Sequence, residues 1–287
     1  MNIDTHFVSS KDGTTIGYRQ MGQGPGLLIV HGTMESSLSH SQLAEVLADN
    51  FTVYLPDRRG RGLSGPYRKD HKIQKDVEDL KAVLSSTGAN FVFGISAGAL
   101  ICLQAALNSS NIHKAALFDP PLIINGSVSG DFMARYDKEI ADGDLVSALV
   151  TAMLGGQMGP PVFNSVPRWL LKMLTKMMMT GDEKNTKNDD VTIRKLAPTI
   201  HYDFNLSFEL EDKHECFRAI DAEVLLLGAS KSPNYFKIAL DTLTQILPHA
   251  KRIEFAGLNH GATGNTNRGG KPERVAQELL RFFKTGI

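Results

Sequence analysis

The chain has 287 residues, with 31 basic and 31 acidic side chains, and 42% of its residues are apolar. This globular composition excludes a disordered chain or coiled coil, and zero net charge argues against nucleic-acid binding. Two cysteines exclude a disulfide framework, no apolar run approaches the ~20 residues of a membrane span, and the first residues lack a secretory signal. We therefore expect a soluble cytoplasmic protein with no nucleic-acid or membrane partner, and the sequence leaves its oligomeric state open.

Short apolar runs alternate with helical patterns along most of the chain. Strand patterns occur at 5–8, 14–19, 26–30, 51–55, 90–93, 114–118, 223–228 and 251–255. Helical spacing occurs at 39–47, 73–84, 97–107, 235–247 and 272–284. Strands separated by helices of roughly 10–15 residues indicate parallel βαβ units. The prediction is an α/β fold with a mostly parallel central sheet flanked by helices.

The segment 125–216 breaks this alternation, because it is mostly helical and shows no clear buried strand. We expect a core formed by 1–124 and 217–287, with 125–216 as a helical cap or lid over one side. The segment holds seven of the ten methionines, whose flexible side chains fill gaps in a core or line an apolar pocket. We expect residues 181–190 to form a solvated loop.

The strongest motif is Gly94-Ile95-Ser96-Ala97-Gly98, which follows an apolar strand and precedes a helical stretch. This strand–turn–helix context is the one in which G-x-S-x-G forms a nucleophile elbow. The glycines permit a tight turn that exposes the serine oxygen at the carboxyl end of the sheet. Ser96 is therefore the predicted nucleophile; the alternative is a glycine-rich turn whose serine only caps the helix.

Two further loops are expected at the same end of the sheet. The turn His31-Gly32-Thr33 follows a buried strand, and a tetrahedral oxyanion requires two preorganised donors, so we predict the N–H groups of Thr33 and Ala97. His260 follows the last core strand and is the predicted general base. His31 is expected to organise its loop. The remaining candidates lack this placement: His40, His71, His113, His201, His214 and His249.

With these motifs the chain resembles the α/β-hydrolase superfamily with an inserted cap. The resemblance rests on His31-Gly32, the run 57–64 (DRRGRGLS), the elbow at Ser96 and the loop 257–261, and it covers the whole core. It implies a Ser–acid–His triad in that chain order. Asp57 is expected to be a turn or cap residue.

The acid departs from the usual pattern of the superfamily. Most relatives carry it after the strand that is 224–227 here, where this chain has Gly228-Ala229-Ser230-Lys231-Ser232-Pro233. Asp119 ends the preceding strand pattern and is followed by two prolines that stiffen the exit. The arrangement is similar to fungal lactonases that open the zearalenone macrocycle and carry Glu in this slot. We predict Asp119 as the acid; the alternative is a turn aspartate beside a Ser–His dyad.

The predicted activity is hydrolysis of a carboxylic ester or lactone of an apolar small molecule through an acyl-enzyme. Cleavage of another acyl bond or of a carbon–carbon bond remains open, as do a lyase or isomerase and a non-catalytic receptor with this fold. No cofactor motif occurs, and His201, Asp203 and His214 are expected to be solvated or core residues and not metal ligands. The residues expected to contact substrate are Gly32, Met34, Met153, Met158 and Trp169.

Overall fold

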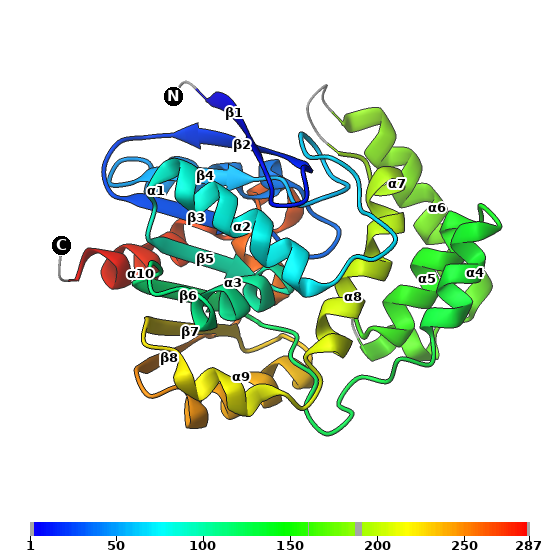
Figure 1. Cartoon of the computed structure of the whole chain (residues 1–287). Helices are drawn as coiled ribbons and strands as arrows, with labels where there is room; N and C mark the ends of the chain where they lie inside the picture. The colour runs from blue at the N-terminus through cyan, green and yellow to red at the C-terminus, as the bar shows by residue number, and fades with distance from the viewer. Residues whose placement is uncertain (1–2, 160, 187–190, 286–287) are drawn as a thin grey trace.

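One eight-stranded sheet forms the centre of the molecule (Figure 1). The computed structural model describes residues 3–159, 161–186 and 191–285. The strands are β1 (Asp4–Ser9), β2 (Thr15–Met21), β3 (Gly26–Val30), β4 (Thr52–Pro56), β5 (Phe91–Ile95), β6 (Lys114–Phe118), β7 (Glu223–Ala229) and β8 (Ala250–Phe255). They lie in the order β1-β2-β4-β3-β5-β6-β7-β8.

The sheet is antiparallel at one edge and parallel elsewhere. β1 and β2 form a hairpin, and β2 pairs antiparallel with β4. From β4 through β3, β5, β6 and β7 to β8, every pairing is parallel. All six of these strands therefore end at the same edge, where their following loops meet. The predicted α/β fold with a mostly parallel sheet is confirmed.

Helices cover both faces of the sheet. The helices of the core are α1 (Ser41–Leu47), α2 (Ile73–Thr87), α3 (Ala97–Leu107), α9 (Asn234–Ile246) and α10 (Pro272–Lys284). α2, α3 and α9 share one apolar core with Leu28 and Val30 of β3, whereas α1 and α10 pack with Leu27 and Ile29. This alternation follows from the two-residue period of a strand, and it explains why the central strands are continuous apolar runs.

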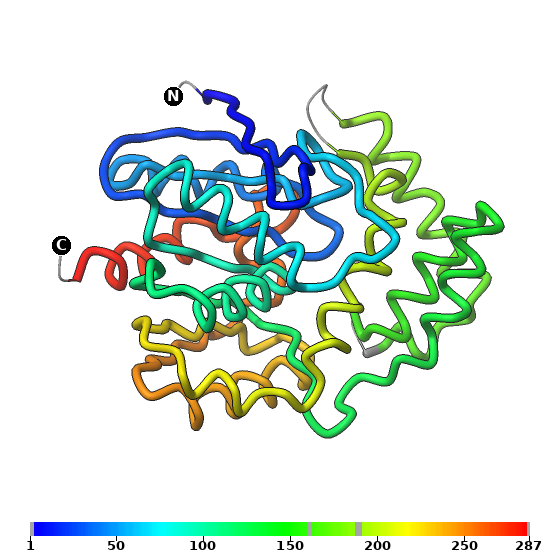
Figure 2. Tube along the Cα trace, viewed as in Figure 1, coloured from blue at the N-terminus to red at the C-terminus, as the bar shows by residue number. Residues whose placement is uncertain are grey.

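The segment 125–216 lies to one side of the sheet and carries α4 (Met133–Ala141), α5 (Leu145–Gly155), α6 (Arg168–Asn185), α7 (Ile193–Leu196) and α8 (Ile200–Glu209) (Figures 1 and 2). The segment has an apolar core of its own, which includes Tyr136, Ala148 and Met179. Met34, from the loop after β3, packs against this core and connects it to the sheet.

The prediction of a loop at 181–190 was wrong for residues 181–185, because α6 continues through Gly181 to Asn185. The Asn185 side chain donates to the Gly181 carbonyl at 2.8 Å within this last part of the helix. Residues 187–190 lie outside the described part of the chain. Within that part, every helix is too short or too polar to traverse a bilayer.

Candidate active site

Ser96 occupies the sharp turn between β5 and α3. Its φ of 52° is unusual for a residue with a Cβ, and its N–H donates to the Phe118 carbonyl at 2.9 Å. A Cβ on Gly98 would lie 2.2 Å from the Val30 carbonyl oxygen, and one on Gly94 would lie 2.6 Å from the Ala99 Cα. The two glycines therefore allow α3 to approach the strands closely. This is the strained elbow that G-x-S-x-G predicts.

Asp119 and His260 meet at the ends of β6 and β8. The Asp119 Oδ2 atom lies 2.9 Å from His260 Nδ1. Asp119 is fully buried, whereas the His260 side chain is 36% exposed, and its ring stacks on Phe236 with centroids 4.4 Å apart. A carboxylate at Nδ1 fixes the tautomer in which Nε2 is unprotonated and can accept a proton.

Ser232, from the usual acid slot after β7, donates to the same Asp119 Oδ2 atom at 2.5 Å. β6 pairs with β7 up to Phe118 and Leu227, and the Asp119 N–H donates to the Leu227 carbonyl at 2.9 Å. A Cβ on Gly228 would lie 3.3 Å from Asp119 Oδ1 and 2.5 Å from Leu240. Gly228 therefore leaves space for the Asp119 carboxylate, and Ser232 donates a hydrogen bond to it, although Asp119 comes from the neighbouring strand.

The loop after β3 lies against the elbow. A Cβ on Gly32 would lie 2.9 Å from the Ser96 Cβ, so only glycine brings the loop this close. The Gly32 N–H donates to Glu35 Oε2 at 2.7 Å and is therefore not free to donate to a substrate oxygen. Thr33 faces the cavity described below. Ala97 is the first residue of α3, where N–H groups have no partner within the helix.

His31 and Asp57 organise the loops beneath this edge. The fully buried His31 accepts a hydrogen bond at Nε2 from the Arg58 N–H, at 3.1 Å, and burial lowers its pKa well below the usual value, aided by Arg61 and Arg58. Asp57 accepts from the N–H groups of Ser37 and Leu63. Both residues therefore act within loops and lie away from the cavity that contains Ser96.

A cavity of about 870 Å³ lies between the sheet edge and the segment 125–216. Ser96, His260 and Thr33 line it from the core. Its apolar lining consists of Pro121, Met153, Leu154, Met158, Phe163, Phe204, Pro233, Tyr235 and Phe236. Polar groups at its wall include Asn164, Asp203, Lys231, Asn234, Asn259 and Arg268. The volume lies within the range of pockets that enclose drug-sized ligands.

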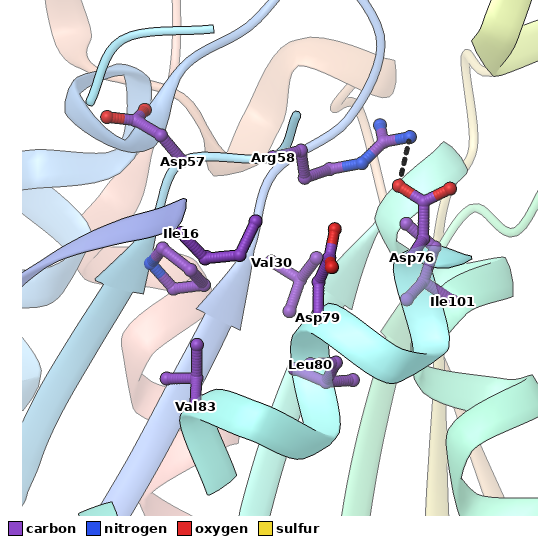
Figure 3. Close-up of a pocket in the computed structure, with 10 residues that line it drawn as sticks. Ile16, Val30, Asp57, Arg58, Asp76, Asp79, Leu80, Val83 and Ile101 are labelled. Carbon is purple, nitrogen blue, oxygen red and sulfur yellow. Dashed lines mark ion pairs between the residues drawn. The ribbon is translucent and has the colours of Figure 1, made fainter. Parts of the chain in front are cut away.

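A second, much smaller void lies under the loop 57–64 (Figure 3). Its volume of about 20 Å³ accommodates about one water molecule, so it is no substrate site. In Figure 3 the Arg58 guanidinium reaches toward Asp76, and the two form an ion pair at 3.5 Å. Arg58 also pairs with Asp203 of α8 at 2.9 Å and thereby connects the loop to the segment 125–216.

Three of the residues expected to contact substrate do not line the large cavity. Trp169 is 68% exposed on the outer side of α6, because that helix buries Leu171, Thr175 and Met179, and the helical repeat turns residue 169 outward. Gly32 lies against the Ser96 Cβ, and Met34 packs against the apolar core of the segment 125–216. Met153 and Met158 do line the cavity.

Several residues near the site carried no signal in the sequence. Phe236, Ser232 and Glu35 come from positions without a motif, and only the fold brings them to His260, Asp119 and the Gly32 turn. In the described part of the chain, no three His, Cys, Asp or Glu side chains are grouped to hold a metal ion. His201 pairs with Asp137 at 2.8 Å, and Asp203 with Arg61 at 2.5 Å.

Comparison with known proteins gives the family. A family model described as alpha/beta hydrolase fold matches residues 25–263. A bifunctional esterase/perhydrolase of Acinetobacter calcoaceticus is 23% identical over 97% of this chain and 99% of its own length. A non-heme haloperoxidase of Rhodococcus erythropolis is 24% identical over the same shares of the two chains.

Among solved structures, an alpha/beta hydrolase from Sphaerobacter thermophilus superposes with a TM-score of 0.79 at 28% identity. That match covers 97% of this chain and 100% of the other. Since the family model spans most of the sequence and the sheet order and elbow agree with it, the chain belongs to the α/β-hydrolase fold family. Its relatives at low identity include an esterase/perhydrolase, a haloperoxidase and a hydrolase.

Proposed function

We propose that this protein is a serine hydrolase that cleaves a carboxylic ester or lactone of an apolar small molecule, with Ser96 as nucleophile, His260 as general base and Asp119 as acid. The observation that carries the proposal is the 2.9 Å contact between His260 Nδ1 and Asp119 Oδ2, with His260 and Ser96 on the wall of one cavity. Nucleophile, base and orienting acid are the three parts that acyl transfer requires.

The reaction begins with proton transfer from Ser96 Oγ to His260 Nε2. The Nδ1–H of His260 donates to Asp119, which keeps the lone pair on Nε2 and stabilises the imidazolium formed by the transfer. The serine oxygen then attacks the carbonyl carbon, and the carbonyl oxygen gains negative charge. In this proposal the N–H groups of Ala97 and Thr33 donate to that oxygen, as oxyanion donors do.

Collapse of the tetrahedral intermediate expels the alcohol, which takes the proton from His260 Nε2 and leaves Ser96 acylated. Water then loses a proton to His260 and attacks the acyl carbon. The bond from that carbon to Ser96 Oγ breaks, Oγ takes the proton back from His260, and the acid is released. For a lactone, the alcohol and the acid remain one molecule, so the product is a hydroxy acid.

The cavity wall supports an apolar substrate. Its apolar residues come from both parts of the chain: Met153, Leu154 and Phe204 from 125–216, and Tyr235 and Phe236 from α9. We propose that 125–216 acts as a cap that excludes water and selects the acyl group, with the domain bounds predicted from the sequence. The cytoplasmic location also stays a prediction.

The test is a panel of p-nitrophenyl esters of increasing acyl length and lactones of increasing ring size, assayed with wild type and Ser96→Ala. We expect Ser96→Ala to fold normally and to lose about 10³–10⁶ in kcat, as removal of a nucleophile does. A fluorophosphonate should label Ser96 in the wild type. Wild-type turnover by a folded Ser96→Ala variant would refute the nucleophile, and a folded wild type that turns over no ester or lactone would refute the reaction class.

Perhydrolysis is a second candidate, because a relative over nearly the whole chain is an esterase/perhydrolase and another is a non-heme haloperoxidase. In that reaction hydrogen peroxide replaces water in attacking the acylated Ser96, so the products are a peracid and the free serine. Peracid formation from a short ester and hydrogen peroxide, absent in Ser96→Ala, is the measurement that tests it.

A further inference from the structure

We propose that Glu35 and His40 are positioning residues that join the loop carrying the oxyanion donor Thr33 to the loop carrying His260. The inference rests on the proposed function, since it assigns the pair a role in aligning those two groups. Neither side chain lines the cavity, so neither touches substrate. Their effect is exerted through the backbone on either side of Ser96.

Glu35 holds the first loop. Its Oε2 atom accepts from the Gly32 N–H at 2.7 Å, immediately before Thr33. A Cβ on Gly32 would lie 2.9 Å from the Ser96 Cβ and 3.1 Å from Glu35 Oε2, so the Gly32 turn lies between the carboxylate and the elbow. A shift of this carboxylate therefore changes where the Thr33 N–H points relative to Ser96.

His40 connects that carboxylate to the second loop. Its Nε2 lies 3.0 Å from Glu35 Oε2, and its Nδ1 lies 3.0 Å from the Thr263 carbonyl oxygen. Thr263 ends the short helix His260–Thr263, which begins with the predicted base. One fully buried imidazole thus spans 223 residues of sequence, from the oxyanion loop to the histidine loop.

The partners of His40 indicate its protonation. The Thr263 carbonyl can only accept, so Nδ1 carries a hydrogen. Nε2 faces a carboxylate, so the arrangement favours an imidazolium that donates from both nitrogens. Burial by itself lowers the pKa of His40, but the charge and hydrogen bond of Glu35 and the Thr263 carbonyl outweigh it and raise the pKa above 6.5.

The other titratable groups near the pair are Arg268, whose charge lowers the pKa of His40, and His31, which lies near Glu35. Burial raises the pKa of Glu35, but the charge and hydrogen bond of His40, together with the Gly32 N–H, lower it below its ordinary value. The two acceptors of His40 and the directions of these pKa shifts both favour an ion pair, which gives both loops a charge-assisted anchor.

Glu35→Ala and His40→Gln test this role, with Glu35→Gln as the conservative variant that keeps an acceptor for Gly32. The matched control is His201→Gln, which removes a different histidine–carboxylate pair, with Asp137, in a half-exposed site. The readouts are the rate at which a fluorophosphonate labels Ser96, and kcat and KM on the best ester. Thermal unfolding confirms that each variant is folded.

We expect Glu35→Ala and His40→Gln to lower the labelling rate and kcat by about 10–100-fold, as a small misplacement of an oxyanion donor does. KM should change less than about threefold because neither residue lines the cavity. Glu35→Gln should retain more activity than Glu35→Ala, and His201→Gln should match the wild type. Folded Glu35→Ala and His40→Gln variants labelled within twofold of the wild-type rate would overturn the role.

A second measurement does not depend on activity or on the folding of a variant. The ring nitrogens of His40 are observed by ¹⁵N NMR of the folded wild type at pH 6, and both should be protonated. A neutral His40 overturns the ion pair on which the proposal rests. If the wild type is not labelled at Ser96 at all, the proposed function fails, and that outcome is distinct from equal labelling of wild type and variants.

Discussion

Replacing Asp119 with Asn is the sharpest test of the predicted acid, because it changes charge and hydrogen bonding with almost no change in shape. In the wild type, Asp119 Oδ2 accepts from both His260 Nδ1 and Ser232 Oγ. The other oxygen, Oδ1, has no donor within the described part of the chain. An asparagine can keep its oxygen toward His260, or it can turn its NH₂ group there.

The two orientations set the limits of the expected loss. With the oxygen toward His260, the tautomer is kept and only the negative charge is lost. Two charges ~4 Å apart at an effective dielectric of about 20 interact by about 4 kcal/mol, which corresponds to roughly 10³ in rate. Since the His260 side chain is 36% exposed, solvent reduces this to about 10²–10³. With NH₂ toward His260, Nδ1 must accept, the wrong tautomer forms, and the loss approaches about 10⁴.

The assay is steady-state kinetics of Asp119→Asn on the best ester, beside two controls. Asp241→Asn removes a carboxylate on α9 that pairs with Arg252 at the surface, and Glu254→Gln removes an exposed one on β8. We expect both controls to stay within twofold of the wild type, and circular dichroism should show that all three variants fold.

A loss of less than threefold in Asp119→Asn, with a hundredfold loss in either control, would place the acid elsewhere. A loss of less than threefold in all three variants would show that His260 works without a carboxylate partner, as a dyad. Neither outcome changes the roles proposed for Ser96 and His260, so the experiment tests the role of Asp119 alone.

Three further predictions follow from contacts in and around the cavity. Ser232→Ala removes one donor from Asp119 and should lower kcat by about 3–10-fold, while Ser232→Thr retains the hydroxyl and most activity; equal losses in the two variants would contradict this. Met153→Trp should reduce kcat/KM for the longest acyl chain at least about tenfold and spare acetate esters, and an equal loss on both would show that Met153 does not select chain length. The pKa of His40 is raised in the folded state, so the folded protein keeps the imidazole proton above pH 6.5, where the unfolded chain releases it. The wild type should therefore be more stable than His40→Gln at low pH, and this difference should shrink as pH rises above 6.5. Urea unfolding at pH 6, 7.5 and 9 measures it, and a difference that grows with pH would reverse the predicted sign.

The sequence predicted the sheet well because its central strands are buried on both faces and therefore appear as short apolar runs. It also located the elbow, since the glycines at 94 and 98 are required by close backbone contacts that leave no alternative residue. The proximity of Asp119 to His260 was accessible for a related reason. An acid at the end of a buried parallel strand must emerge at the edge where the other strands end.

The surface of α6 and the network behind the site could not be predicted. Trp169 and the methionines 173, 177 and 178 are apolar residues that face outward, so composition pointed to a pocket that they do not line. Glu35 and His40 lie close together in sequence, but the Thr263 carbonyl that completes their contacts is a backbone group more than 200 residues away. Backbone acceptors leave no trace in residue type, so only the folded chain places them.

The adjacency of the β6 and β7 ends affects how the acid of such a protein is recognised from its sequence. The carboxylate of Asp119 occupies space that Gly228 leaves open, and Ser232 donates a hydrogen bond to it. Residues at the ends of both strands therefore form the site of this one carboxylate. A sequence alignment that inspects only the column after β7 would find Ser230, Lys231 and Ser232 there and would classify this chain as a degenerate copy.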